Sequence, residues 1–288
     1  MSPARTERAV VWSLRGAALA AAAIVGLIVA LLLVESIPAI RNLALRLVTD
    51  SGWYPAPAAT DGSFRITPMV VGTMLITAGA VVIAAPLGLA SALFCRFFAP
   101  PGVAAIYRRL VELLAGIPGV IYGFWGLVVL VPLISALRPP GASVLTAIVV
   151  LALMILPTVA LLSESALRDV PQRHLQAAAA LGLSRWGTIA GVALPAARSG
   201  IVTAVILATG RAIGETLAVV MVVGNIVQIP SSLLQPARAL TGNIALEMGY
   251  ASGDHRSALF FSGLILLVLV MLLTALAAWL RGDEHDHA

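Results

Sequence analysis

Residues 176–195 read Q-A-A-A-A-L-G-L-S-R-W-G-T-I-A-G-V-A-L-P and lie between two long apolar runs. Pro171 predicts the start of a helix and Gly182 its end, while Ser184 predicts the cap of a second short helix that Pro195 closes. Alanine side chains leave the backbone accessible to another protein. Four nearby arginines indicate the cytoplasmic side: Arg168, Arg173, Arg185 and Arg198. We therefore expect a helix-turn-helix elbow on which a cytoplasmic partner rests.

The composition is that of a membrane protein. Of the 288 residues, 60% are hydrophobic and 11% are charged, and the mean hydropathy is +1.02, which excludes a soluble globular protein. The fold class is therefore all-α, a polytopic membrane protein. Six membrane-spanning helices are predicted at 16–34, within 66–95, at 113–137, at 143–163, from about 199 and at 257–280. The single cysteine, Cys95, excludes an internal disulfide, and we expect it to be a small packing residue.

The arginines indicate the orientation of the chain in the membrane. Eleven fall on the inner side of the predicted spans and six on the outer side, so both termini are expected in the cytoplasm. A cleaved signal peptide is the competing interpretation, but the first apolar run is long and no small-residue cleavage site follows it. Loop arginines also account for the net charge of +5, so no nucleic-acid partner is expected.

All 18 basic residues are arginine, so the chain lacks the lysine that a Walker A motif requires. We therefore expect a transport subunit that is not an enzyme, with any ATP hydrolysis on a separate chain. The spans as drawn contain Glu215 as their only acid and no histidine or aspartate, which disfavours a membrane enzyme or an intramembrane metal site. The histidines of the terminal tail, residues 282–288, are expected to be solvated and to hold no metal.

The fifth span carries charges in the sequence G-R-A-I-G-E-T, residues 210–216. A helix that starts near Ser199 puts Arg211 about 18 Å along its axis, beyond the middle of a hydrocarbon core roughly 30 Å thick. Arg211 and Glu215 are four residues apart and would share a helical face, so they could simply neutralise each other. Alternatively, Arg211 lines a polar path and offers its planar fork of donors to an oxyanion, with Glu215 and Thr216 beside it.

Three other stretches carry expectations. Residues 35–65 form an external segment in which Trp53 and Tyr54 are expected at the membrane interface. The external segment 224–256 is expected to form short re-entrant or interfacial helices, which either close a path or have no gating role. The glycines of the third span are expected to let helix backbones approach, or else to break the helix beside a cavity: Gly116, Gly119, Gly123 and Gly126.

Two sets of motifs resemble known families. The elbow resembles the EAA loop with which bacterial ABC importer permeases contact their ATPase, although Gln176 stands where that family usually has Glu and Val192 where it has Ile. The chain from about residue 68 onward is similar to phosphate-specific permeases of the PstC type, in G-R-A-I-G-E-T, in L-A-G-I-P-G-V-I-Y-G-F-W-G-L from Leu114, in M-I-L-P from Met154, and in two later blocks. Gly119 replaces a serine that is frequent there. The elbow positions that match are Gln176, Ala177, Ala178, Gly182, Val192, Leu194 and Pro195.

The resemblance implies a type I ABC importer permease fold in a bacterial plasma membrane. Residues 1–67 would hold the first helix and first external segment, and residues 68–281 the permease domain, with the coupling loop at 167–195. The implied partners are a PstA-like second permease, a PstB-like ATPase dimer inside, a PstS-like binding protein outside and the lipid bilayer, with no cofactor.

The implied function is ATP-driven import of inorganic phosphate. A permease for molybdate, sulfate or phosphonate remains an alternative, because an intramembrane arginine suits any oxyanion. So does a membrane sensor of phosphate that docks a cytoplasmic partner without moving solute.

Overall fold

A computed structural model describes residues 3–43, 45–55 and 62–282, and these are almost entirely helical. The long helices are α1 (Pro3–Leu43), α3 (Thr67–Leu93), α4 (Pro101–Ala115), α7 (Val144–Arg168), α10 (Leu194–Gly214) and α13 (Gly253–Gly282). The shorter helices are α2 (Arg46–Thr49), α5 (Gly119–Trp125), α6 (Val131–Ser135), α8 (Gln172–Ala180), α9 (Arg185–Thr188), α11 (Leu217–Val222) and α12 (Leu240–Glu247). Three π-helical turns adjoin them, η1 (Phe94–Phe98), η2 (Gly126–Leu130) and η3 (Ile189–Ala193), and one antiparallel hairpin joins β1 (Trp53–Tyr54) to β2 (Ser63–Phe64).

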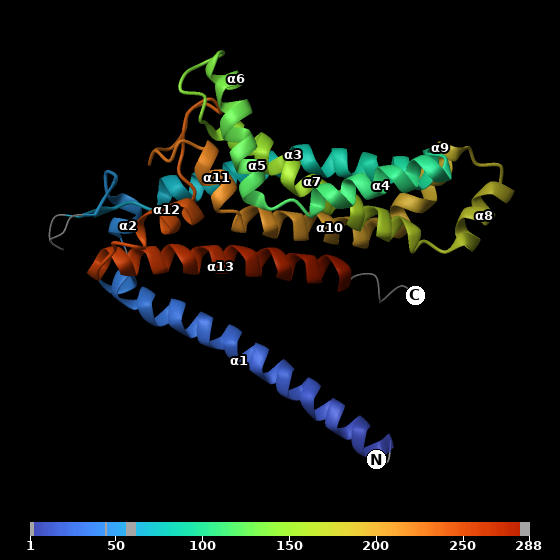
Figure 1. Cartoon of the computed structure of the whole chain (residues 1–288), viewed down its shortest axis with the longest axis horizontal. Coiled ribbons are helices and arrows are strands. Elements are labelled where there is room, and N and C mark those ends of the chain that lie inside the picture. Colours follow the sequence, from blue (N-terminus) through green and yellow to red (C-terminus); the bar gives the residue numbers. More distant parts are fainter. Residues whose placement is uncertain (1–2, 44, 56–61, 283–288) are drawn as a thin grey trace.

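The long helices run side by side along the longest axis of the molecule. Helix α7 packs along both α3 and α10, and α13 packs along α10 and α1 (Figure 1). Helices α8 and α9 lie at one end, which we call the elbow end, and α2, the hairpin and α12 lie at the other, the hairpin end. The described start of α1 and the described end of α13 both lie toward the elbow end.

Among the residues that the structure describes, five helical segments are long and apolar enough to cross a membrane, and a bent pair of helices, counted as one span, makes a sixth. The expected span at 113–137 is corrected, because α4 and the helix beginning at Gly119 meet at an angle of 90°. Pro118 lacks an amide hydrogen and Gly116 ends α4, so the helix breaks between them. The first and fourth spans are longer than expected, since α1 runs from Pro3 to Leu43 and α7 continues to Arg168.

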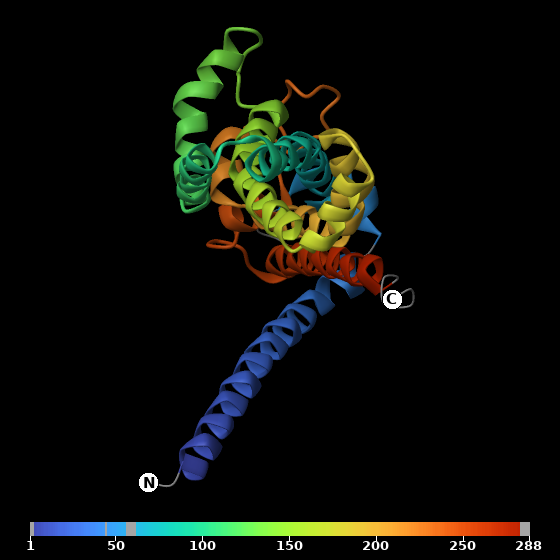
Figure 2. The ribbon, with the colours of Figure 1, turned by 90° about the vertical axis from the view of Figure 1, so that its right-hand side faces the viewer.

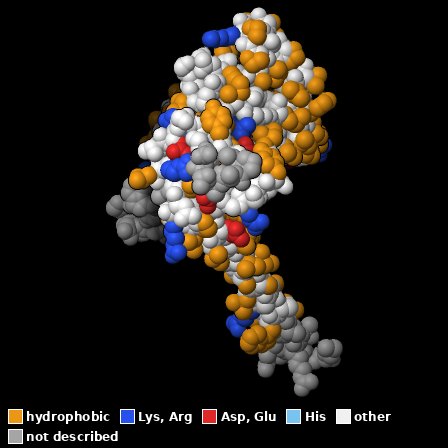
Figure 3. All heavy atoms as spheres, turned by 90° about the vertical axis from the view of Figure 1, so that its left-hand side faces the viewer, with side chains coloured by type: hydrophobic (Ala, Val, Ile, Leu, Met, Phe, Trp, Pro, Cys, Tyr) orange, Lys and Arg blue, Asp and Glu red, His pale blue; other side chains and the backbone are white. Residues whose placement is uncertain are grey.

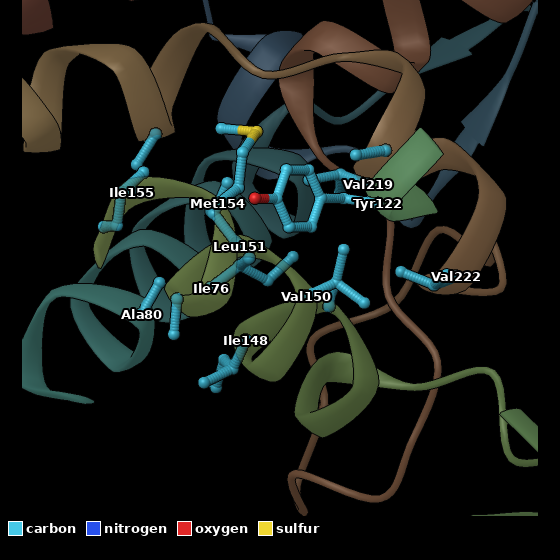
Figure 4. Close-up of a cluster of buried hydrophobic side chains, with 14 of the residues drawn as sticks. Ile76, Ala80, Tyr122, Ile148, Val150, Leu151, Met154, Ile155, Val219 and Val222 are labelled. Carbon is cyan, nitrogen blue, oxygen red and sulfur yellow. The ribbon is translucent and has the colours of Figure 1, made fainter. Parts of the chain in front are cut away.

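The main core fills the space between α3, α5, α7 and α11. It is made of small and branched apolar side chains, which let the helices approach closely. The ring of Tyr122 lies among Leu151, Met154 and Val219 (Figure 4). This packing fixes the position of α5 immediately after the break at Pro118.

The hairpin end has its own small core. Trp53 is buried and meets Phe64 edge to face with ring centroids 5.8 Å apart. The expectation that Trp53 sits at the membrane interface is therefore wrong, whereas Tyr54 is exposed. Figure 3 looks onto this end, where arginine and acidic side chains gather around the hairpin.

Helix α1 leaves the bundle. Its hairpin-end half packs on α13, and its other half diverges from the rest of the chain (Figures 1 and 2). None of the most apolar 18 residues of α1 is buried. The chain alone therefore leaves this face for lipid or another protein.

Candidate functional site

Helix α10 ends inside the bundle, immediately before Glu215. Gly214 is its last residue, and Glu215 is extended, with φ −68° and ψ 128°. The chain then starts α11 at Leu217. Because the helix stops, Arg211 and Glu215 do not share a helical face, and the expectation from their spacing is wrong.

Arg211 lies on α10 with its side chain exposed. Its guanidinium donates a long hydrogen bond of 3.4 Å to the hydroxyl of Thr158 on α7. No carboxylate of the described residues lies within 4.0 Å of it as an ion pair. Helix α10 begins at Leu194 and not near Ser199, so Arg211 comes about 25 Å along it. A charged group is therefore presented far along a membrane helix with donors to spare.

The carboxylate of Glu215 lies between two helix starts. One oxygen accepts a hydrogen bond of 3.1 Å from the amide of Ala218 in the first turn of α11. A β-carbon added to Gly119, the first residue of α5, would lie 2.9 and 3.0 Å from the two carboxylate oxygens. The hydroxyl of Thr241 on α12 donates to the backbone carbonyl of Glu215 at 2.9 Å. Glycine at 119 thus leaves the space that the carboxylate occupies.

Thr216 has a local role in the structure. Its hydroxyl donates to the carbonyl of Gly214 at 3.2 Å, and its own carbonyl accepts from Val220 at 2.9 Å. These bonds hold the turn between α10 and α11. Thr216 is half-buried next to Glu215, so its place on a substrate path stays a prediction.

Two broken helices meet at this point. A β-carbon on Gly123 would lie 2.6 Å from the Cα of Ala218, and one on Gly126 would lie 2.5 Å from a methyl group of Val150. Glycines therefore allow α5 to touch α11 and η2 to touch α7, and the glycine-rich segment combines the two roles that its sequence left open: close approach and a break. Together, Arg211, Glu215 and the two breaks form what we call the break site.

The elbow has the expected local form. Pro171 precedes α8, Gly182 adopts φ +75° after it, and the Ser184 hydroxyl accepts the amide of Gly187 at 3.1 Å to cap α9. Of the matched positions, Gln176, Ala177 and Gly182 are exposed, whereas Ala178 is buried. Ala178 therefore packs inside the chain and does not belong to the outer surface.

Pro195 does not end the second elbow helix as expected. Helix α9 continues through η3 into α10, and together they form an unbroken segment, Arg185–Gly214. Pro195 is the second residue of α10 and follows η3. This π-helical turn contains Val192 and begins at the buried Ile189. Pro195 lacks an amide hydrogen, and the wider π-helical turn η3 just before it accommodates this missing donor, which explains how the helix continues. Leu194 and Val192 are half-buried.

The elbow also presents large apolar side chains that the motif did not single out. Leu181, Leu183 and Trp186 are exposed, with 80%, 45% and 61% of their surface accessible. Apolar side chains on a surface that is otherwise polar mark an interaction site. In the sequence, apolar residues flank Gly182 on both sides, but the prediction of a docking surface considered only the alanines.

A buried carboxylate on α7 was also missed. Glu164 is buried and accepts hydrogen bonds from Arg108 of α4, whose Nε lies 3.0 Å away, and from Arg168, at 3.0 Å. The expected end of the span at residue 163 excluded Glu164 from the membrane helix. This ion pair fixes the position of α4 against α7.

The hairpin end contains a second buried carboxylate. Glu247 accepts from the indole Nε1 of Trp53 at 2.7 Å and from Arg238 at 2.6 Å, and it lies 2.8 Å from the Nε2 of His255. These residues, which we call the Glu247 cluster, come from four separate segments of the chain. Within residues 3–43, 45–55 and 62–282, no group of three or more His, Cys, Asp or Glu side chains is arranged to hold a metal ion.

Comparison with known sequences gives the family. Residues 84–282 match the model of the "Binding-protein-dependent transport system inner membrane component" family. The chain is 38% identical to the "Probable ABC transporter permease protein YqgH" of Bacillus subtilis, over 83% of this chain and 78% of that protein. It is 33% identical to the "Phosphate transport system permease protein PstC" of Mesorhizobium japonicum, over 92% of this chain and 87% of the relative.

Solved structures give the fold. A bacterial alginate ABC transporter, in complex with an alginate pentasaccharide-bound periplasmic protein, matches with a TM-score of 0.64 at 14% identity over 92% of both chains. The inward-facing MetNI methionine ABC transporter matches with a TM-score of 0.56 at 23% identity, over 75% of this chain and 92% of that one. At these identities the likeness concerns the fold alone, and it confirms the expected importer-permease architecture.

Proposed function

Because the chain belongs to the family of binding-protein-dependent transport system inner membrane components, we propose that it is the permease subunit of an ATP-driven importer of inorganic phosphate. The break site supplies the anion chemistry. Two relatives that are named phosphate permeases match this chain over most of their length, which supports phosphate as the anion.

The observation that carries the proposal is the position of Arg211. Its guanidinium lies on a membrane helix, keeps donors free beyond the bond to Thr158, and forms no ion pair with a described carboxylate. An unneutralised arginine in such a place is costly unless an anion or water reaches it. A phosphate oxyanion matches the planar fork of donors that arginine presents.

Glu215 lies close to this path but is held by other groups. Its carboxylate is fixed by Ala218 and by the space at Gly119, so it does not cancel the charge of Arg211. Phosphate near neutral pH still carries a proton that a carboxylate can accept in a hydrogen bond, whereas sulfate carries none. We propose that Arg211 attracts the anion and that Glu215 selects the protonated one.

The elbow would transmit the energy of ATP hydrolysis. Gln176, Ala177 and Gly182 are exposed beside the apolar Leu181 and Trp186, a surface suited to an ATPase partner. In this arrangement the elbow end and both termini face the cytoplasm of the cell. A PstB-like ATPase dimer binds there, a PstA-like permease completes the membrane part, and a PstS-like binding protein delivers phosphate to the hairpin end.

Uptake by the reconstituted complex tests the proposal. Vesicles that contain the complete importer should accumulate phosphate only with internal ATP and external binding protein. Arg211→Lys keeps the charge but loses the bidentate fork, and loss of one charge-assisted hydrogen bond should reduce uptake by about tenfold or more. Arg109→Lys, on α4, is the matched control and should transport normally.

Other outcomes separate the alternatives. Uptake of sulfate or molybdate in place of phosphate would assign a different oxyanion. ATP hydrolysis stimulated by the binding protein, with no accumulation of any anion, would indicate a sensor and contradict the transport function.

A further inference from the structure

A groove with a mixed polar and apolar lining runs between α7 and α10, from Leu162 and Leu207 to the elbow. The cavity has a volume of about 400 Å³, and its walls come from the last turns of α7, the start of the elbow and the first half of α10. Its polar lining is Ser165, Asp169, Ser199 and Thr203. We call it the inner groove.

Arg211 lies beyond the inner end of the groove, on the same helical faces that line it. On α10, Gly200, Leu207 and Arg211 follow one another at spacings of seven and four residues, which place them on one face. One face of α7 likewise carries residues at spacings of four, three and four: Thr158, Leu162, Ser165 and Asp169. Thr158 and Arg211, which are hydrogen-bonded, therefore stand above the groove, and Leu162 and Leu207 separate them from its hydroxyl groups.

The described residues of the lining offer an anion hydroxyl groups but no cation, and the carboxylate of Asp169 disfavours its retention. The hydroxyls of Ser165 and Ser199 make no hydrogen bond to other described residues, so they remain able to donate. The Thr203 hydroxyl donates to the carbonyl of Ser199 at 2.7 Å and offers only an acceptor. No arginine belongs to the lining of this cavity as the described residues define it. Conduction requires contacts that are favourable enough to enter and weak enough to leave.

A second groove on another side of α10 provides a comparison. It lies between α3, α10 and α13, has a similar volume of about 440 Å³, and is almost wholly apolar. Its lining includes Met74, Val81, Thr209, Ile213, Leu269 and Leu272. The hydroxyl of Thr209 is also bonded to its own helix, at 2.7 Å from the carbonyl of Val205. The two grooves thus differ in polarity and not in size.

We propose that the inner groove is the cytoplasmic leg of the anion path, which an anion enters after leaving Arg211 and passing Leu162 and Leu207. The assignment rests on the proposed function for the direction of movement and for the identity of the anion. The groove ends at Pro171 and Ala197, beside the elbow, so a movement of the elbow changes the width of this exit. Gly200 brings α10 against Ala166 in its floor, where an added β-carbon would lie 2.5 Å from the Ala166 methyl group.

Cysteine labelling of the assembled importer tests the groove. The only cysteine of this chain, Cys95, is buried, and its replacement by alanine leaves this chain without a thiol; labelling is then read on this chain after the subunits are separated. Single cysteines are then placed at Ser199 and Thr203 in the inner groove, with Ser165→Cys on the opposite wall as an independent variant. Thr209→Cys is the matched control, because it replaces a threonine with the same helix bond in the apolar groove. The probe is the anionic reagent sulfonatoethyl methanethiosulfonate, added to complexes in lipid nanodiscs.

The inner-groove cysteines should react at least tenfold faster than Thr209→Cys. Added inorganic phosphate should slow their reaction at least threefold, and labelling should stop uptake in vesicles while leaving Thr209→Cys active. Equal rates in the two grooves, or labelling that leaves uptake intact, would contradict the proposal. If sulfate protects the thiols and is transported while phosphate does neither, the inner groove stands and the phosphate assignment fails.

Discussion

At the scale of single residues, the molecule separates two charges that four-residue spacing would bring together. Arg211 is the last charged residue of α10, and Glu215 lies past the helix end, capping α11. An ion pair between them would leave neither group for an anion. The separation depends on the end of α10 at Gly214 and on glycine at position 119, which leaves room for the carboxylate.

Glu215→Gln tests selection by the carboxylate. Glutamine keeps the shape and still accepts the hydrogen bond from Ala218, so folding should be unchanged while the negative charge is lost. Sulfate uptake should then become measurable relative to phosphate uptake, or phosphate should be retained longer. Wild-type rates and selectivity for both anions would end the role assigned to Glu215.

Gly119→Ala is the companion variant, because it moves the same carboxylate without removing its charge. The new methyl group would lie 2.9 to 3.0 Å from the carboxylate oxygens, which must shift by a few tenths of an ångström. Transport should change in the same direction as in Glu215→Gln but less. Gly102→Ala serves as a control, since nothing lies within 4 Å of its added carbon.

At the scale of elements, the elbow depends on one backbone conformation. Gly182 has φ +75°, which costs a β-branched residue about 1–2 kcal/mol and which asparagine tolerates better. Nothing lies within 4 Å of an added β-carbon there, so any effect arises from the backbone and not from an internal clash.

Gly182→Val should therefore uncouple ATP hydrolysis from transport, because it reorients α8 relative to α9, while Gly182→Asn should remain coupled. The measurement is the ratio of ATP hydrolysed to phosphate accumulated in vesicles. A normal ratio in the valine variant would remove the coupling role of this turn.

The sequence predicted those elements whose signals are local. Pro171, Gly182 and Ser184 specify the elbow through proline, positive φ and a cap, and each acts within one turn of chain. The apolar runs specified the spans to within several residues at most ends. No residue near these positions predicts that α9 and α10 join through a π-helical turn, or that α10 ends before Glu215.

Side-chain partners distant in sequence were not predictable in the same way. Arg211 was identified as an intramembrane cation, but its partner Thr158 is 53 residues away. Trp53 was taken for an interfacial aromatic because its acceptor, Glu247, is 194 residues away. Such contacts depend on how the elements pack against one another, and the periodicity of apolar residues within one element does not predict them.

At the scale of the whole molecule, the Glu247 cluster joins the hairpin, Arg238, α12 and α13 at one end. Its carboxylate is buried and bonded to an indole, a guanidinium and an imidazole. This end is therefore expected to behave as one unit.

Glu247→Ala should destabilise the chain by about 3 kcal/mol, because it removes the shared acceptor of Trp53, Arg238 and His255 and leaves the half-buried Arg238 without its carboxylate. Trp53→Phe removes only one hydrogen bond to a charged acceptor and should cost about 1.5–3 kcal/mol. Thermal unfolding of the purified complex in detergent measures both. Equal melting temperatures for wild type and Glu247→Ala would show that the cluster does not hold this end together.

The uninterrupted segment Arg185–Gly214 has a mechanical consequence. Thirty residues of helix reach about 45 Å, from the surface that carries Trp186 to the end of the helix below Glu215. In the proposed orientation, a push applied at the Trp186 end reaches the other end as tilt or translation, apart from what the π-helical turn η3 between them absorbs. The size of the movement at the break site then depends on the length of this helical segment, which lies between two turns that contain glycine, at Gly182 and at Gly214.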